Sequence, residues 1–307
     1  MSDEKYYIYP EKVNTLILLV SIATYFLLLF VFSNFDKIEL KILSSLLVAF
    51  PLLTIFSLLH ETVHESFCRN TKLNKVIGRG LALFFPSSFT AQKNFHLTHH
   101  EYNRSPWEQF DFIREDDNKI LKALQWYSIL TGLYWLVMVF SLFILFFIPK
   151  SLVTLILERN EKTRFETQTG FYKYLRSLYL TDFTIIKIEL LITILFHVTI
   201  CLIFNINFLE WLFFYAPFAF IWSNIQYADH AFSPLSKNDG AWNLKTSAVF
   251  SKVILNYNYH LNHHRFPKAP WTNLKDIDDK LGPSIFTVIL EMWKGPKNIN
   301  ESKQTIF

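Results

Sequence analysis

The chain has 307 residues, of which 51% are hydrophobic and 18% are charged, and its formal net charge is +4. Soluble domains carry about 25% charged residues, so this deficit indicates a membrane protein and argues against a disordered chain. Seven glycines leave no glycine-rich loop with a dinucleotide fingerprint. Two cysteines are too few for a four-thiolate metal site or a disulfide scaffold. The ten histidines are therefore the informative residues.

Four apolar segments predict membrane spans, each of which needs about 20 helical residues. They are Val13–Phe32, Lys41–Leu59, Leu190–Phe204 and Phe208–Ile225. We expect the first two to form an antiparallel hairpin and the last two to form a second hairpin across the short turn 205–207. The charged N-terminal residues lack the pattern of a cleaved signal peptide, so the first span is expected to remain as an anchor.

Two further apolar segments do not fit a simple span. Trp126–Leu157 is interrupted at Pro149 and is flanked by two basic loops, 61–125 and 158–187, the second of which includes Lys162 and Arg164. Loops rich in Lys and Arg face the cytoplasm, so this segment must return to the side that it leaves. We expect a bent, partly inserted segment broken near Pro149. Leu81–Phe89 is too short to span and is expected to lie at the interface or to re-enter the membrane.

These patterns predict an all-α integral membrane protein, with about four transmembrane helices and a re-entrant or interfacial apolar segment. A helical cytoplasmic cap would carry the remaining residues. No internal repeat or low-complexity run divides the chain, so we treat residues 1–307 as one domain.

The first histidine cluster lies at the end of the second predicted span. His60 and His64 are four residues apart and therefore share one helical face, where both can bind the same ion. The intervening Glu61 completes a His-Glu-x-x-His pattern, which is also the signature of zinc proteases. An intramembrane zinc protease is therefore one hypothesis.

Two more clusters share one spacing, with a pair of histidines three residues apart followed by an adjacent third. They are His96, His99 and His100, and His260, His263 and His264. A zinc protease needs one ligand beyond its helical pair, so six extra histidines are too many for it. His230, just beyond the last span, adds a ninth histidine on the predicted cytoplasmic side. His197 falls inside a predicted span, and we interpret it as structural.

Nine histidines are more ligands than one metal ion can bind, so the clusters predict two metal ions. Imidazole suits iron, copper, zinc and nickel, and ligand type alone leaves the metal open. In a lipid-embedded protein, two histidine-bound metals without thiolates favour chemistry with dioxygen on an unreactive C–H bond.

The three histidine boxes resemble those of the membrane fatty acid desaturase superfamily, which also contains hydroxylases and carotenoid ketolases. The third box continues as Arg265-Phe266-Pro267, similar to the His-x-x-His-His-x-x-Pro ending of desaturases. The resemblance extends from His60 to Pro267 and implies a non-haem di-iron, O2-dependent oxidoreductase. The three-residue spacing in the first box is similar to that of acyl-lipid desaturases, hydroxylases and ketolases rather than acyl-CoA desaturases.

The same resemblance, followed position by position along this sequence, implies which residues bind the metal ions. They are His60, His64, His96, His99, His100, His230, His260, His263 and His264. Gln226 falls where some acyl-CoA desaturases have an asparagine that reaches iron through water, and Asn256 is an alternative donor. Either could equally be an ordinary polar residue.

Nearby polar residues have two interpretations. Glu61, Glu65 and Asp229 can orient imidazole N–H groups, or they can be solvated charges at the membrane face. Arg104 and Asp111 are better interpreted as loop structure and packing than as catalytic groups.

The resemblance also implies the reaction partners. A lipid or fatty acyl chain would be the substrate, and two electrons would come from a separate cytochrome b5-like or ferredoxin-like carrier. Such a carrier would dock on the basic cap. A fatty acid desaturase is the leading hypothesis, with a hydroxylase or ketolase using the same centre as the alternative. A zinc protease and a non-enzymatic metal-binding or transport protein are more distant ones.

Overall fold

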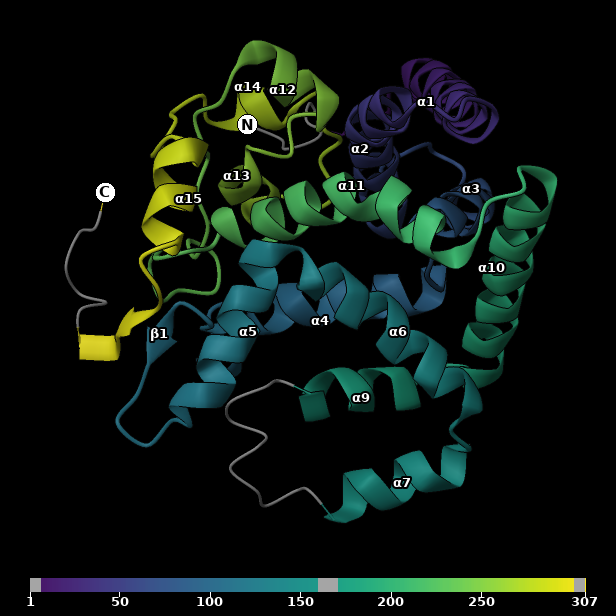
Figure 1. The fold of residues 1–307 in the computed structure, drawn as a ribbon. Coiled ribbons are helices and arrows are strands. Elements are labelled where there is room, and N and C mark those ends of the chain that lie inside the picture. The colour runs from purple at the N-terminus through teal and green to yellow at the C-terminus, as the bar shows by residue number, and fades with distance from the viewer. Residues whose placement is uncertain (1–6, 160–170, 301–306) are drawn as a thin grey trace.

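The computed structural model describes residues 7–159, 171–300 and 307, and most of these are helical (Figure 1). The predicted basic residues Lys162 and Arg164 lie outside the described residues. In chain order the helices are α1 (Glu11–Asn34), α2 (Ile38–Val63), α3 (Thr71–Phe84), α4 (Phe89–Tyr102), α5 (Lys119–Thr131), α6 (Leu133–Phe147), α7 (Lys150–Arg159), α9 (Phe171–Tyr179), α10 (Phe183–Ile203), α11 (Phe208–Ala228), α12 (Ala248–Val253), α13 (His260–Arg265), α14 (Leu274–Ile277) and α15 (Ile285–Met292). A 3-10 turn, η2 (Pro106–Glu108), precedes β1 (Phe112–Ile113), which pairs in parallel with β2 (Lys297–Asn298).

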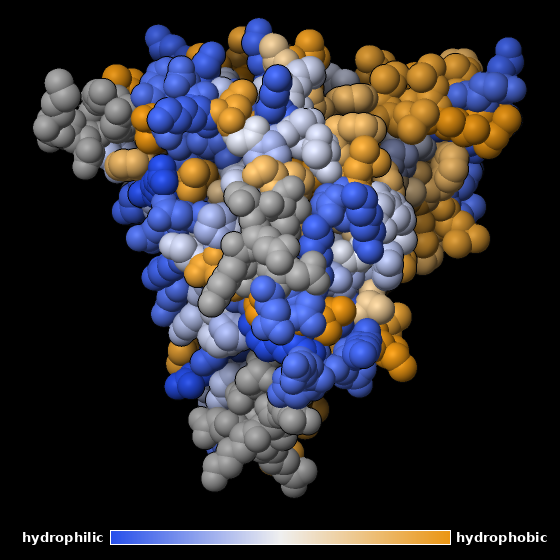
Figure 2. Space-filling model, turned by 90° about the vertical axis from the view of Figure 1, so that its left-hand side faces the viewer, coloured by the Kyte–Doolittle hydropathy of each residue, from blue (hydrophilic) through white to orange (hydrophobic). Residues whose placement is uncertain are grey.

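Four helices are long and apolar enough to cross a membrane, which confirms the predicted all-α membrane architecture. They are α1, α2, α10 and α11. The most apolar stretches of α2 and α11 are 61% and 50% buried, against 22% and 28% in α1 and α10. The inner pair therefore builds the core, while the outer pair turns apolar side chains outward, as lipid-facing helices do. Figure 2 shows hydrophobic residues gathered on the right-hand side of the molecule and hydrophilic residues over the left and centre.

The first predicted hairpin is confirmed, because α1 packs against α2. Polar contacts fix its N-terminal end: the Asn14 side-chain amide donates to the Phe67 carbonyl at 2.9 Å and accepts from the Trp271 indole at 2.8 Å. Three segments far apart in the chain thus meet where α2 delivers its histidines.

The second predicted hairpin is present near its turn, where the Trp211 indole of α11 donates to His197 of α10, but it is wrong beyond that point. The turn between α10 and α11 is tight, and Asn207 and Glu210 form a capping box that begins α11. The two helices then diverge, since α11 packs against α2, α5 and α6, whereas α10 packs against α3, α4 and α6 (Figure 1). Turn chemistry fixed the connection, but tertiary contacts determined the direction of each helix.

The apolar segment 126–157 is broken twice. The expected break near Pro149 is present, since α6 ends at Phe147 and α7 begins at Lys150. A sharper bend of 104° separates α5 from α6 at Gly132, which sequence analysis missed. Gly132 has a φ of 82°, and a Cβ there would lie 2.9 Å from the Phe220 backbone. Only glycine combines this left-handed conformation with so close an approach to α11.

Leu81–Phe89 does not form an element of its own. It comprises the end of α3, a short turn and the first residue of α4. Leu81, Phe85 and Phe89 are buried in the main hydrophobic core beside α2 and α11. A short apolar run bounded by polar residues cannot by itself distinguish membrane contact from burial inside the protein.

The bend at Gly132 gives a test of the fold. Gly132→Ala should lower the thermal unfolding temperature, because a left-handed alanine costs about 1 kcal/mol or more and its methyl group would clash with Phe220. Gly80→Ala is the matched control: it lies in α3 with no atom within 4 Å of the added methyl, so it should be neutral or stabilising. Equal stability of the two variants in thermal unfolding would contradict this account of the bend.

Candidate metal centre

Four structural elements converge to bring nine histidines together. His60 and His64 end α2, while α4 carries His96, His99 and His100. His230 follows α11, and α13 carries His260, His263 and His264. Ser88 accepts a hydrogen bond from the Ala91 amide and so begins α4, whose histidines contact those of α2 and α13.

The histidines separate into two adjacent groups. In the first group, ligand atoms of His60, His64, His96 and His263 lie within 4.8 Å of one another. The second group combines His99, His230, His260 and His264 within the same limit. His100 Nε2 lies 2.9 Å from Nε2 of both His96 and His263, so it joins the first group.

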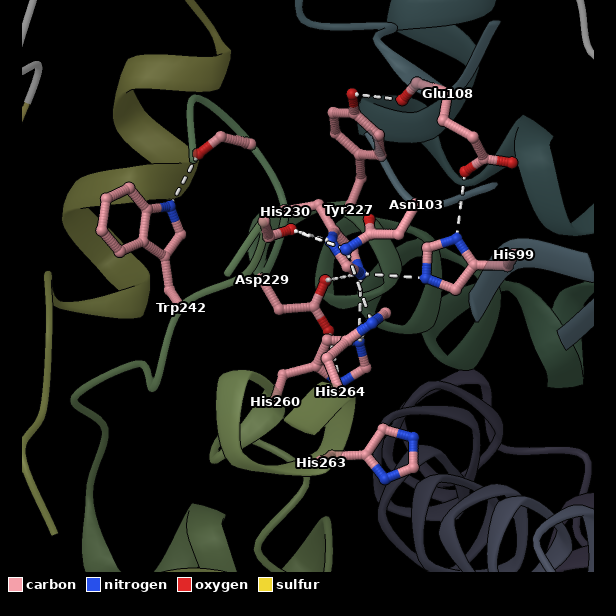
Figure 3. Close-up of polar contacts among 12 residues, drawn as sticks. His99, Asn103, Glu108, Tyr227, Asp229, His230, Trp242, His260, His263 and His264 are labelled. Atoms are coloured by element: carbon pink, nitrogen blue, oxygen red, sulfur yellow. Dashed lines mark hydrogen bonds and ion pairs between the residues drawn. The ribbon is translucent and has the colours of Figure 1, made fainter. Parts of the chain in front are cut away.

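The spacing of the nitrogens matches metal coordination. Nε2 of His230 is 3.1 Å from Nε2 of His99 and 3.0 Å from that of His260 (Figure 3). In the first group, Nε2 of His60 and His96 are 3.0 Å apart. Two nitrogens bound at right angles about 2.1 Å from one ion would be about 3.0 Å apart. Each histidine group therefore holds nitrogen donors at the separation expected of two ligands bound to the same metal ion.

Protonation supports the same interpretation. Burial, reinforced by the neighbouring imidazoles, lowers the pKa of His64, His96 and His263 well below the usual value. Burial and nearby His99 lower the pKa of His100 to about 2. These imidazoles are neutral at pH 7, which is the form that binds a metal.

In the second group, hydrogen bonds from Nδ1 direct Nε2 toward the centre. His230 Nδ1 donates to the Gly240 carbonyl at 2.7 Å, and His99 Nδ1 donates to the Glu108 carboxylate at 3.0 Å (Figure 3). A proton fixed on Nδ1 leaves the Nε2 lone pair free for a metal. Glu108 was not predicted from the sequence, because the chain turns at Arg104 in a left-handed conformation (φ 58°) that no sequence pattern indicates.

Of the three carboxylates proposed to orient imidazoles, Asp229 is the one that reaches a histidine in the described chain. Its Oδ2 lies 3.3 Å from Nδ1 of His260, and both residues are buried. Glu65 instead pairs with Lys93 at 2.8 Å. Glu61 accepts from the Ser66 hydroxyl at 2.9 Å and from the Trp271 amide at 3.2 Å, so it fastens a loop to α2.

The other uncertain residues have structural contacts. Asn256 bonds Ser251 and the Trp271 carbonyl, as expected of an ordinary loop asparagine. His197 bonds the Leu83 carbonyl at 2.8 Å and accepts from the Trp211 indole, which agrees with its structural interpretation. Gln226 lines the cavity beside the histidines.

Arg104 and Asp111 form a buried ion pair behind the second group. The guanidinium makes two bonds to the carboxylate, at 3.1 and 2.9 Å. Asp111 also accepts from the Tyr227 hydroxyl at 2.7 Å and from the Phe232 amide at 2.6 Å. Tyr227 and Phe232 lie on either side of His230 in the sequence, so the ion pair holds the segment that carries this histidine.

A cavity of about 560 Å³ opens from the histidines between α4, α6, α9 and α11. His60, His96, His99, His230 and His260 lie at its polar end. Beyond them the walls are mainly apolar: Val137, Met138, Ile144 and Leu145 of α6 face Leu175 and Leu178 of α9. The site can therefore hold an apolar chain against the histidine groups.

The fold and site define a helical membrane protein with two adjacent all-histidine sites beside an apolar cavity. A family model, fatty acid desaturase, matches residues 40–293, which is most of the chain and includes all nine histidines. The chain belongs to the fatty acid desaturase family. Membership supports an oxidoreductase of the desaturase or hydroxylase type that acts on lipid. No curated protein matches the sequence.

The buried ion pair gives a second test. Asp111→Ala should destabilise the protein by about 3–5 kcal/mol, because it leaves the buried Arg104 charge without a partner. Asp239→Ala is the control, since Asp239 pairs with Arg265 on the surface and its loss should cost below about 1 kcal/mol. Thermal unfolding in detergent measures both, and similar losses would contradict the structural role of Asp111.

Proposed function

We propose that the protein is a membrane di-iron desaturase that uses O2 to introduce a double bond into the alkyl chain of a lipid. The observation that carries the proposal is the pair of all-histidine groups at the end of an apolar cavity, in a chain of the fatty acid desaturase family. The two iron ions, when bound, would supply the oxidising power that breaks unreactive C–H bonds.

The nine histidines would divide between the two ions as the geometry groups them. His60, His64, His96, His100 and His263 would hold one ion, and His99, His230, His260 and His264 the other. Neutral imidazole nitrogens without thiolates suit iron that reacts with O2. A zinc protease is disfavoured because the Glu61 carboxylate, its required general base, bonds Ser66 and Trp271 instead.

The cavity walls would position the substrate. The stretch of α6 from Tyr134 to Leu145 lines the cavity and rises about 16 Å at 1.5 Å per residue. The hydrocarbon of one membrane leaflet is about 15 Å thick, so the length suits the acyl chain of a membrane lipid. Val137 and Ile144 line the cavity and are also well exposed, which supports entry of the chain from the bilayer along α6.

Electrons would come from a separate carrier, either cytochrome b5-like or ferredoxin-like. We propose that it docks on the cytoplasmic face that carries the histidines. An acidic carrier would be attracted by the excess of Lys and Arg over Asp and Glu in the chain.

Product analysis tests the proposed reaction. Expression in a host of defined lipid composition, followed by mass spectrometry of fatty acids and carotenoids, should reveal a lipid with a new double bond. His263→Ala, which removes one ligand of the first group, should abolish that product. A hydroxyl or keto product without a new double bond would contradict desaturation and support the alternative chemistry of the same centre.

The cavity gives a separate prediction about chain length. Leu145→Trp adds an indole to the cavity wall and should shift the products toward shorter acyl chains. Phe147→Trp is the control, because Phe147 lies on the same helix but is 78% exposed and does not line the cavity. An unchanged chain-length profile in Leu145→Trp, measured by mass spectrometry, would contradict the assignment of this cavity to the substrate.

A further inference from the structure

One carboxylate links the second histidine group to the wall of the cavity. Glu108 Oε2 accepts from His99 Nδ1 at 3.0 Å, and Glu108 Oε1 accepts from the Tyr174 hydroxyl. Tyr174 belongs to α9, far from His99 in sequence, and its ring packs edge-on against Phe95 of α4 at 5.5 Å. Both Glu108 and Tyr174 line the cavity. The three side chains thus form one chain of hydrogen bonds from α9 to a histidine of the second group.

Glu108 is held at both its backbone and its side chain. Its carbonyl accepts from the Tyr227 hydroxyl at 3.1 Å (Figure 3), and the residue is 7% exposed. Burial, together with the charge of Glu108, raises the pKa of Tyr174 well above its usual value, so its hydroxyl keeps its proton and acts as the donor. The carboxylate therefore accepts at both oxygens.

We infer that Glu108 and Tyr174 are positioning residues for the second metal site, and that α9 thereby supports that site as well as enclosing the substrate. The inference rests on the proposed function, because it requires a metal at the second group. Glu108 keeps the proton on His99 Nδ1, turns Nε2 toward the ion and makes the imidazole a stronger donor. Tyr174 holds the carboxylate in that orientation.

Cobalt binding tests the inference without any need for the substrate. Purified full-length protein is titrated with Co2+ under anaerobic conditions, and the two ions are followed by visible absorption and by competition with a chelator. Tyr174→Phe keeps the ring against Phe95 and removes only the hydroxyl. Glu108→Gln keeps an acceptor for His99 and removes the charge. The matched control is Tyr179→Phe, whose hydroxyl on the same helix accepts from Thr154 and does not contact Glu108.

The wild-type protein and Tyr179→Phe should bind two Co2+ ions with the same affinities. Tyr174→Phe and Glu108→Gln should bind one of the two ions about 10- to 100-fold more weakly and leave the other unchanged, because the contacts reach His99 alone. Glu108→Gln should also shift the absorption band of the weakened ion.

Three results separate the possible failures. Affinities equal to wild type in both variants would overturn the positioning role while leaving the proposed function intact. Equal weakening of both ions would also overturn it, since that pattern indicates a general loss of structure. Failure of the wild-type protein to bind two ions would instead contradict the proposed function.

Discussion

Nine imidazoles gathered in two groups, most of them with Nε2 about 3 Å from that of a neighbour, are the constraint on which the rest of the structure depends. Neighbouring imidazoles with lone pairs aimed at a common point repel one another, and burial keeps members such as His96 and His263 uncharged. A cation at each point removes the repulsion, so the arrangement is favourable chiefly when metal is bound. In its absence, packing of the surrounding helices must hold the imidazoles together.

Several contacts in the surrounding structure hold the imidazoles together. The inner helices α2 and α11 form the core, and each delivers a histidine segment at its C-terminal end. Behind the second group, Asp111 gathers Arg104, Tyr227 and the Phe232 amide around the segment of His230. Glu61, one residue from His60, secures the Trp271 loop that follows α13. Residues that resemble catalytic acids in sequence thus serve to hold the ligands.

The sequence predicted the four spans and the two-metal hypothesis because both depend on local patterns. Apolar length predicts a span, and histidines three or four apart share a helical face whatever the tertiary fold. The sequence did not predict the bend at Gly132, the divergence of α10 from α11 or the contact of Glu108 with His99. Each depends on packing between distant segments or on a left-handed residue. The division of the histidines into two groups likewise emerges only when the histidines of α4 and α13 meet in the folded chain.

Metal analysis of the purified protein tests the central claim most directly. Elemental analysis combined with X-ray absorption at the iron edge would give both the number of ions and the atoms bound to them. We expect about two iron ions per chain, each bound mainly by imidazole nitrogen and without sulfur. A single zinc ion per chain, or iron bound mainly by sulfur, would contradict it.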